Sequence, residues 1–70
     1  MNLKSFKKYF HDELINLYST DELNSLFFVL INYYLEISKI KYIQNPQKRI
    51  NKSKIKKLFS KIKLLKENMP

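Results

Sequence analysis

Glycine and cysteine are absent from the sequence, and proline occurs only twice in its 70 residues. Without glycine, hairpins with the usual tight turns, phosphate-binding loops and dinucleotide-binding motifs have no support. Without cysteine, the chain has neither a disulfide framework nor a cysteine-based zinc site, which fits a reducing compartment. The missing residue types therefore argue against β-hairpin folds and against several common cofactor sites.

Long hydrophobic runs are missing as well. The longest strongly apolar run, residues 26–31, is far shorter than the ~20 residues that a membrane-spanning helix needs. The N-terminus lacks the ordered charged, apolar and cleavage segments of a signal peptide. We therefore expect a cytoplasmic protein with no membrane partner.

Apolar side chains are nevertheless abundant enough to form a core. Hydrophobic residues make up 44% of the chain and include five phenylalanines and five tyrosines. The chain is long enough for one small domain, which buries only about 60% of the surface that it exposes when unfolded. An efficient core is thus both possible and necessary.

The net charge of +8 is unevenly distributed along the chain. Residues 1–36 contain three lysines and five acids, whereas residues 37–70 contain eleven basic residues and one acid, so the halves carry −2 and +10. Such asymmetry can indicate a surface for nucleic acid or for an acidic partner. A compositional bias toward lysine, with the charges simply facing water, explains the same pattern.

Apolar residues recur at helical spacing from the start of the chain. Asn2 is a plausible N-cap, and the spacing predicts a helix over about residues 3–18. A second helix is predicted from Ser19, which can form a capping box with Glu22, to about Leu35. Because this second helix is apolar over most of its circumference, we expect it to be central. The apolar stripe of the first helix comprises Leu3, Phe6, Phe10, Leu14 and Leu17.

A short third helix is predicted after Ser38, which is another good N-cap. It should end at Gln44 or Asn45 because Pro46 restricts the residue before it, and residues 46–50 should form a turn. We expect its apolar residues to point inward and its lysines outward, namely Ile40 and Ile43 inward and Lys39 and Lys41 outward.

The last helix is predicted to follow Asn51, with an apolar stripe on one side and lysines on the other. Leu64 is the exception, since it falls among the lysines. The fold predicted from these segments is all-α, a compact bundle of four to five short helices. The candidate partner-contact surface is Lys54, Lys57, Lys61 and Leu64, and the apolar stripe is Ile55, Leu58, Phe59, Ile62, Leu65 and Met69.

No constellation of catalytic or metal-binding residues is recognisable. His11, Asp12 and Glu13 are adjacent on a helix and point in different directions, so they cannot converge on one ion, and His11 is expected at the rim of the core. Asp21 and Glu22 are explained by the start of the second helix. We therefore expect no catalytic, cofactor-binding or metal-binding residue, and no enzymatic activity from this chain alone.

The order of these features resembles the N-terminal helical domain of the HemK/PrmC family, the release factor glutamine methyltransferases. The second helix has an acidic start and an aromatic middle, DELNSLFFVLINYYL, and a Leu-x-x-Ser turn at Leu35 to Ser38 follows. Asn45-Pro46, the pair Ile50-Asn51 and an amphipathic segment running to Pro70 come next. Glu36 departs from the family pattern, which often has glycine at this position.

The resemblance implies that residues 1–67 are a substrate-recognition domain and that residues 68–70 begin a linker to a C-terminal methyltransferase domain. That absent domain would bind S-adenosylmethionine and methylate the glutamine of the Gly-Gly-Gln motif in a peptide chain release factor. The implied partners are the release factor and the catalytic domain itself. Asn45-Pro46 lacks the second proline and the tyrosine of the family's catalytic motif, so no catalytic residue is transferred to this chain.

The alternative is a free-standing basic helical module that binds nucleic acid. Several lysines along the last helix could contact phosphates. Residues that read bases are sparse, however, and Arg49 is the sole arginine and falls in a turn. Sequence-specific DNA recognition is therefore poorly supported.

Overall fold

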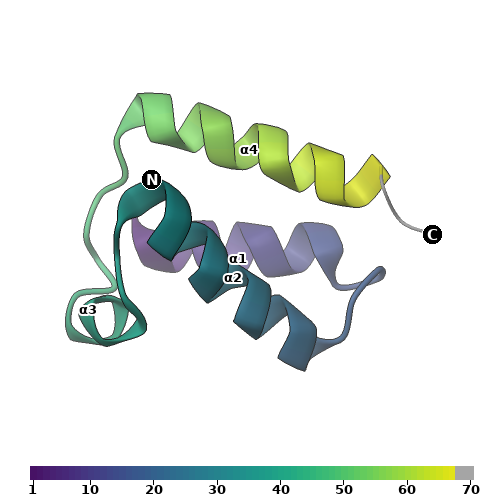
Figure 1. The fold of residues 1–70 in the computed structure, drawn as a ribbon, viewed down its shortest axis with the longest axis horizontal. Helices are drawn as coiled ribbons and strands as arrows, with labels where there is room; N and C mark the ends of the chain where they lie inside the picture. The colour runs from purple at the N-terminus through teal and green to yellow at the C-terminus, as the bar shows by residue number, and fades with distance from the viewer. Residues whose placement is uncertain (68–70) are drawn as a thin grey trace.

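The structure, a computed structural model, describes residues 1–67, which form four helices joined by short turns. They are α1 (Leu3–Leu14), α2 (Thr20–Leu35), α3 (Lys39–Gln44) and α4 (Lys52–Glu67). The three longer helices pack against one another, and α3 lies at one end of the bundle (Figure 1). The predicted all-α bundle is confirmed.

Capping side chains start the helices at the predicted positions. The Asn2 side chain accepts a hydrogen bond from the N–H of Ser5 (2.8 Å). The Ser19 hydroxyl accepts one from the N–H of Glu22 (3.2 Å), and the Glu22 carboxylate accepts one from the N–H of Ser19 (3.3 Å). This is the predicted capping box, and Ser38 caps α3 through its own hydroxyl.

The residues at the start of α1 pair with the turn between α3 and α4. The Leu3 N–H donates to the carbonyl of Lys48 (2.9 Å), and the Lys4 N–H donates to that of Pro46 (2.9 Å). In return, the Ile50 N–H donates to the carbonyl of Met1 (2.9 Å). Because the first N–H groups of a helix have no partner within it, these bonds satisfy two donors of α1 and hold the turn against the bundle.

The core lies where α1, α2 and α4 meet. Three phenylalanines form its centre, with ring centroids 6.3 Å apart for Phe6 and Phe10, 6.0 Å for Phe6 and Phe27, and 5.9 Å for Phe10 and Phe27. As predicted, α2 packs against two neighbours. The buried hydrophobic residues are Leu3, Phe6, Phe10, Leu14, Leu23, Phe27, Leu30, Ile31, Ile37, Ile50, Leu58 and Ile62.

The predicted stripe of α4 faces this core. Leu58 and Ile62 are buried, and Ile55, Phe59 and Leu65 are partly buried against the core. The remaining member of the predicted stripe, Met69, lies outside the described residues.

The first helix is four residues shorter than the predicted range of 3–18. It ends at Leu14, whose carbonyl accepts the N–H groups of Leu17 (2.9 Å) and Tyr18 (3.1 Å) in the following turn. The chain must change direction here because Ser19 already caps α2. The turn also lets the Tyr18 hydroxyl donate to the carbonyl of Leu65 (3.2 Å), which ties this corner to the end of α4.

The predicted inward orientation of the α3 isoleucines was wrong, whereas Lys39 and Lys41 are exposed as predicted. Ile40 and Ile43 do not point inward; they are 67% and 64% exposed. Tyr42 is the residue that packs inward, with its ring 5.4 Å from that of Phe27 and 5.5 Å from that of Phe28. Because α3 has only six residues, one narrow side of it can contact the bundle, and the isoleucines lie off that side.

Glu36 closes α2 with a left-handed backbone. Its φ of 56° and ψ of 35° place it in the region that favours glycine. The N–H of Ile37 bonds to the carbonyl of Ile31 (3.3 Å), and Ile37 is buried. The N–H of Glu36 bonds to the carbonyl of Asn32 (3.1 Å), which is the hydrogen bond of an αL helix cap.

Truncation of the central phenylalanine should unfold much of the protein. Because Phe27 is fully buried, we expect Phe27→Ala to lower the free energy of unfolding by ~3 to 5 kcal/mol, and Leu30→Ala by ~2 to 5 kcal/mol. Val29→Ala on the exposed side of α2 is the matched control and should change it by less than ~1 kcal/mol. Urea unfolding followed by circular dichroism measures all three. Equal stability of the Phe27 and Val29 variants would contradict the described core.

Glycine at position 36 should stabilise the protein. An L-residue pays about 1 to 2 kcal/mol for the left-handed conformation, and the greater chain entropy of glycine offsets part of the gain. We expect Glu36→Gly to raise the free energy of unfolding by about 0.5 to 1 kcal/mol, whereas Glu36→Ala, which keeps the Cβ atom, should give no such gain. Thermal unfolding of the two variants decides the point, and a destabilised Glu36→Gly would count against the described cap.

Candidate partner-binding surface

The four residues predicted to contact a partner occupy one side of α4. Lys54, Lys57, Lys61 and Leu64 follow one another at steps of three or four residues, which aligns them along the helix. Lys57 is exposed, Leu64 is 49% exposed, and Lys54 and Lys61 are half-buried at the edge of the core. We call these four residues the α4 surface.

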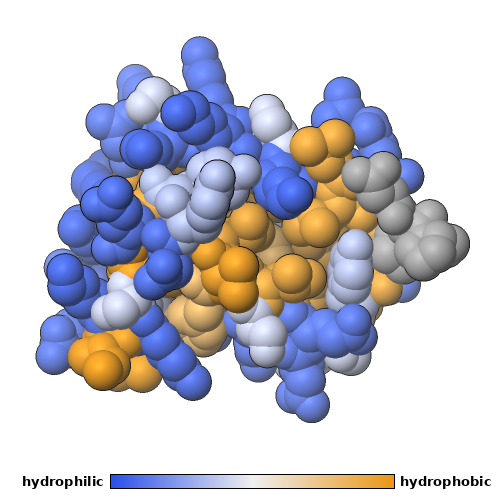
Figure 2. All heavy atoms as spheres, viewed as in Figure 1, coloured by the Kyte–Doolittle hydropathy of each residue, from blue (hydrophilic) through white to orange (hydrophobic). Residues whose placement is uncertain are grey.

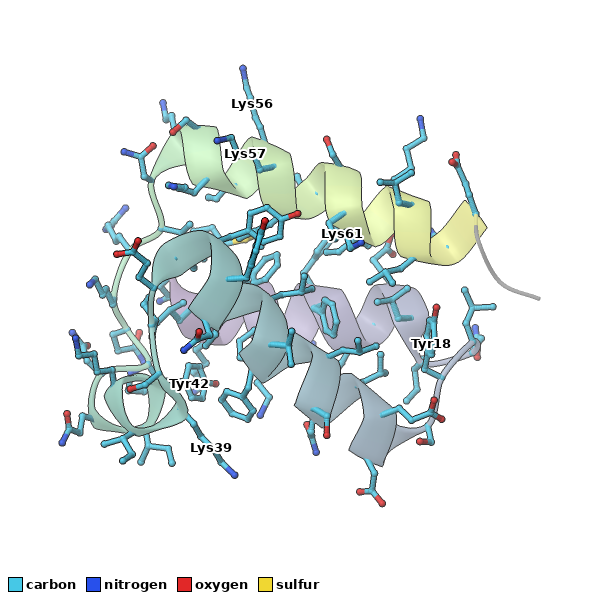
Figure 3. All side chains as sticks on the ribbon, in the orientation of Figure 1. Tyr18, Lys39, Tyr42, Lys56, Lys57 and Lys61 are labelled. Atoms are coloured by element: carbon cyan, nitrogen blue, oxygen red, sulfur yellow. The ribbon has the colours of Figure 1, made fainter. Side chains whose placement is uncertain are left out.

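Apolar side chains adjoin the α4 surface. Lys61 extends into the space between α4 and α2, whereas Lys56 points away from the bundle (Figure 3). On the same face, hydrophobic atoms gather along α2 and its seam with α4, and polar side chains surround them (Figure 2). At one end, Lys54 lines a hollow of about 220 Å³ with Leu35, Ile37 and Arg49. A partner placed here would meet positive charge beside apolar surface.

The lysines of the α4 surface are not neutralised by the fold. Within residues 1–67, the ion pairs join Lys66 to Glu13 (3.2 Å) and Lys8 to Asp12 (3.7 Å), and neither involves Lys54, Lys57 or Lys61. These ammonium groups are therefore available to carboxylates or phosphates of another molecule. Each such exposed pair would contribute little alone, so affinity requires several together.

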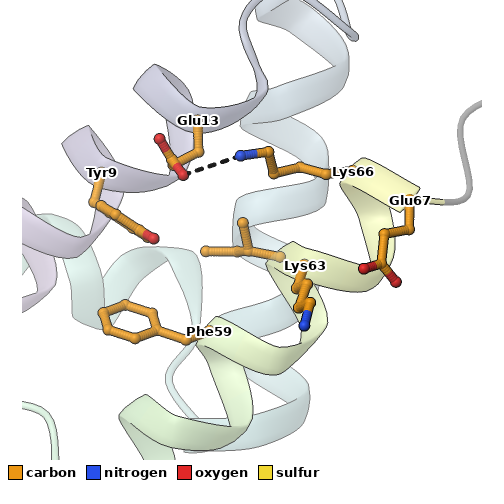
Figure 4. A pocket seen from close by; sticks show the side chains of 7 residues that line it. Tyr9, Glu13, Phe59, Lys63, Lys66 and Glu67 are labelled. Carbon is orange, nitrogen blue, oxygen red and sulfur yellow. Dashed lines mark hydrogen bonds and ion pairs between the residues drawn. The ribbon is translucent and has the colours of Figure 1, made fainter.

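A second hollow lies between α1 and α4 but selects no particular charge. It has a volume of about 450 Å³ and is bordered by the rings of Tyr9 and Phe59, whose centroids are 4.9 Å apart (Figure 4). Charges of both signs surround it, and Lys66 already pairs with Glu13. The hollow therefore lies at the packed boundary between α1 and α4, with charged residues of both signs around its rim.

Within residues 1–67, no group of three histidine, cysteine, aspartate or glutamate side chains is placed to hold a metal ion. Glu22 is used by the capping box, and its neighbour Asp21 is exposed. Across the same residues, no helix combines the length and apolar content needed to cross a membrane.

His11 is half-buried, and its Nε2 atom has no hydrogen-bond partner within the described part of the chain. Burial, and secondarily the charge of Lys7, lowers the pKa of His11 below its ordinary value of 6.5. The Asn24 side chain and the Asp12 carboxylate oppose this shift more weakly. The neutral imidazole is therefore the form that the fold favours.

Sequence reasoning missed a group of aromatic rings around the ammonium of Lys7. The Lys7 Nζ atom lies 5.5 Å from the ring centroids of Phe28 and Tyr42 and 5.7 Å from that of Phe27. The adjacent Phe27 and Phe28 in the sequence were a signal for an aromatic group. The expectation that Ile40 and Ile43 faced inward, however, gave Tyr42 no role.

No protein-family model, curated protein or solved structure matches the chain.

Acidification should destabilise the protein through His11. The pKa of His11 is lower in the folded state, so the unfolded state binds more protons as the pH falls through about 6.5. The free energy of unfolding should thus decrease from pH ~8 to pH ~5 and level off once the folded state is also protonated. Urea unfolding across this range measures the effect. His11→Gln should flatten the profile, and an unchanged slope in that variant would contradict the assignment.

Proposed function

We propose that this chain is the N-terminal recognition domain of a HemK/PrmC-type release factor glutamine methyltransferase. In this proposal, residues 1–67 help to hold a peptide chain release factor. The methyl transfer from S-adenosylmethionine to the glutamine of the Gly-Gly-Gln motif belongs to a C-terminal domain outside this sequence. The chain alone has no catalytic role.

The backbone at Glu36 is the observation that carries the proposal. Glu36 stands where the family often has glycine, and its left-handed φ of 56° is the conformation that glycine adopts without steric cost. The helix end before it and the Ser38 cap after it fit the same Leu-x-x-Ser turn. A local geometry that suits glycine at this position supports the resemblance independently of composition.

The α4 surface supports a binding role in particular. Its lysines are free of ion pairs within residues 1–67, and the exposed Leu64 lies in line with them. Interfaces combine apolar contact with complementary charge at their edges. The α4 surface offers both to an acidic region of a release factor.

Substitution of two lysines of the α4 surface tests this role. We expect the double change Lys57→Gln and Lys61→Gln to weaken binding of a release factor by about fivefold, because two favourable charge pairs are lost. Lys56→Gln is the matched control, since Lys56 is on the same helix but points away from the bundle (Figure 3). NMR spectra of the ¹⁵N-labelled chain, recorded as unlabelled release factor is added, detect even weak binding.

Two results would contradict the proposal. One is the absence of any release-factor-dependent change in the spectrum of the chain. The other is binding of S-adenosylmethionine by the isolated 70-residue chain in calorimetry, since the proposal assigns the cofactor to another domain. An equal loss of affinity in the Lys56 control would remove the specific role of the α4 surface.

The charge of one hollow favours nucleic acid as a second candidate partner. Lys48, Arg49 and Lys54 line the same hollow at the start of α4. Binding through phosphates would make the affinity for duplex DNA fall steeply and linearly with the logarithm of salt concentration. The absence of detectable binding to a labelled duplex at low salt would eliminate this candidate.

A further inference from the structure

A positively charged hollow lies where α1, α2 and α3 meet, away from the α4 surface. It has a volume of about 350 Å³ and is lined by Lys4, Lys7, Lys8, His11, Asn24 and Tyr42. Three of these residues are lysines from the first two turns of α1, and Tyr42 comes from the inward side of α3 (Figure 3). We call this site the Lys7 hollow.

The ammonium of Lys7 is held in position before any ligand arrives. Three aromatic rings lie within 5.7 Å of its Nζ atom, and the negative faces of such rings attract a cation. A lysine held in this way loses less side-chain freedom when it binds an anion. Within residues 1–67, no carboxylate pairs with Lys7 or Lys4, and Lys8 has only an exposed pair with Asp12.

The polar groups around the hollow suit an anion. The lysines supply donors with positive charge, and the Asn24 amide and the Tyr42 hydroxyl can donate further hydrogen bonds. The nearest acid along α1, Asp12, is exposed and already pairs with Lys8. Carboxylates and phosphates both fit this set of donors.

The aromatic rings favour a peptide over single-stranded nucleic acid. Base stacking requires an open ring face. Phe27 is buried, and the ammonium groups of Lys7 and Lys39 lie 5.5 Å and 5.4 Å from the ring centroid of Phe28. The hollow also lacks arginine, the residue best suited to grip phosphate with two hydrogen bonds.

We propose that the Lys7 hollow binds an acidic segment of a protein partner, whose aspartate or glutamate side chains pair with Lys4 and Lys7. This gives the chain a second contact on helices other than α4. In the context of the proposed function, the segment belongs to the release factor, and only that attribution rests on the proposed function.

Binding of a short fluorescein-labelled peptide of alternating glutamate and alanine tests the proposal. Fluorescence anisotropy at low salt should show binding, and the same peptide with glutamine in place of glutamate should not bind. Lys7→Gln should weaken the affinity by about fivefold, and the control Lys56→Gln by less than about twofold. Equal losses in the two variants, or equal binding of both peptides, would overturn the proposal.

Lys4→Gln keeps the test valid if Lys7→Gln disturbs the packing of the rings. Because Lys4 is exposed, its substitution should leave the thermal unfolding temperature unchanged. It should weaken the affinity for the glutamate peptide by about threefold. An unchanged affinity in this folded variant would overturn the proposal. So would a labelled oligothymidylate that binds more tightly than the peptide and loses affinity with Lys7→Gln.

The release factor itself separates this proposal from the proposed function. If the glutamate peptide requires Lys7 but no release factor binds, the hollow stands and the proposed function fails. If a release factor binds the wild-type chain and Lys7→Gln equally well, the proposed function stands and this use of the hollow fails.

Discussion

Phe27 links the core of the bundle to its charged surface. On one side its ring contacts Phe6 and Phe10, which join α1 to α2. On the other side it contacts Tyr42 and lies 5.7 Å from the ammonium of Lys7, which places α3 against the bundle. A chain of 70 residues has little stability to spare, so one residue that serves both the core and the surface constrains the whole molecule.

The arrangement of charge follows from this packing. The helices turn their apolar sides inward, so the lysines of α1 and α4 are left on two separate surfaces. The α4 surface combines lysines with an exposed leucine, whereas the Lys7 hollow combines lysines with covered aromatic rings. Both are suited to a protein partner with acidic groups, which is the role that the proposed recognition domain requires.

Local chemistry made the helix starts predictable, because Asn2, Ser19 and Ser38 each satisfy a nearby N–H group. The apolar stripes of α1 and α4 were also predictable, because their residues recur at regular helical spacing. Burial and orientation that depend on contacts between distant segments were not predictable. Ile37 and Ile50 lie in turns and are nevertheless buried, and turns have no periodic pattern from which burial could be predicted. The orientation of α3 depends on its contact with Phe27, so the Lys7 hollow could not be found from the sequence alone.

The intact mass of the native gene product tests the central claim most directly. The product can be captured from the source cell with an antibody raised against the 70-residue chain and weighed by mass spectrometry. The proposed domain predicts a polypeptide several times heavier than 8.5 kDa that binds S-adenosylmethionine through its additional part. A native product of 8.5 kDa would contradict the methyltransferase proposal and leave the two lysine surfaces as the basis for function.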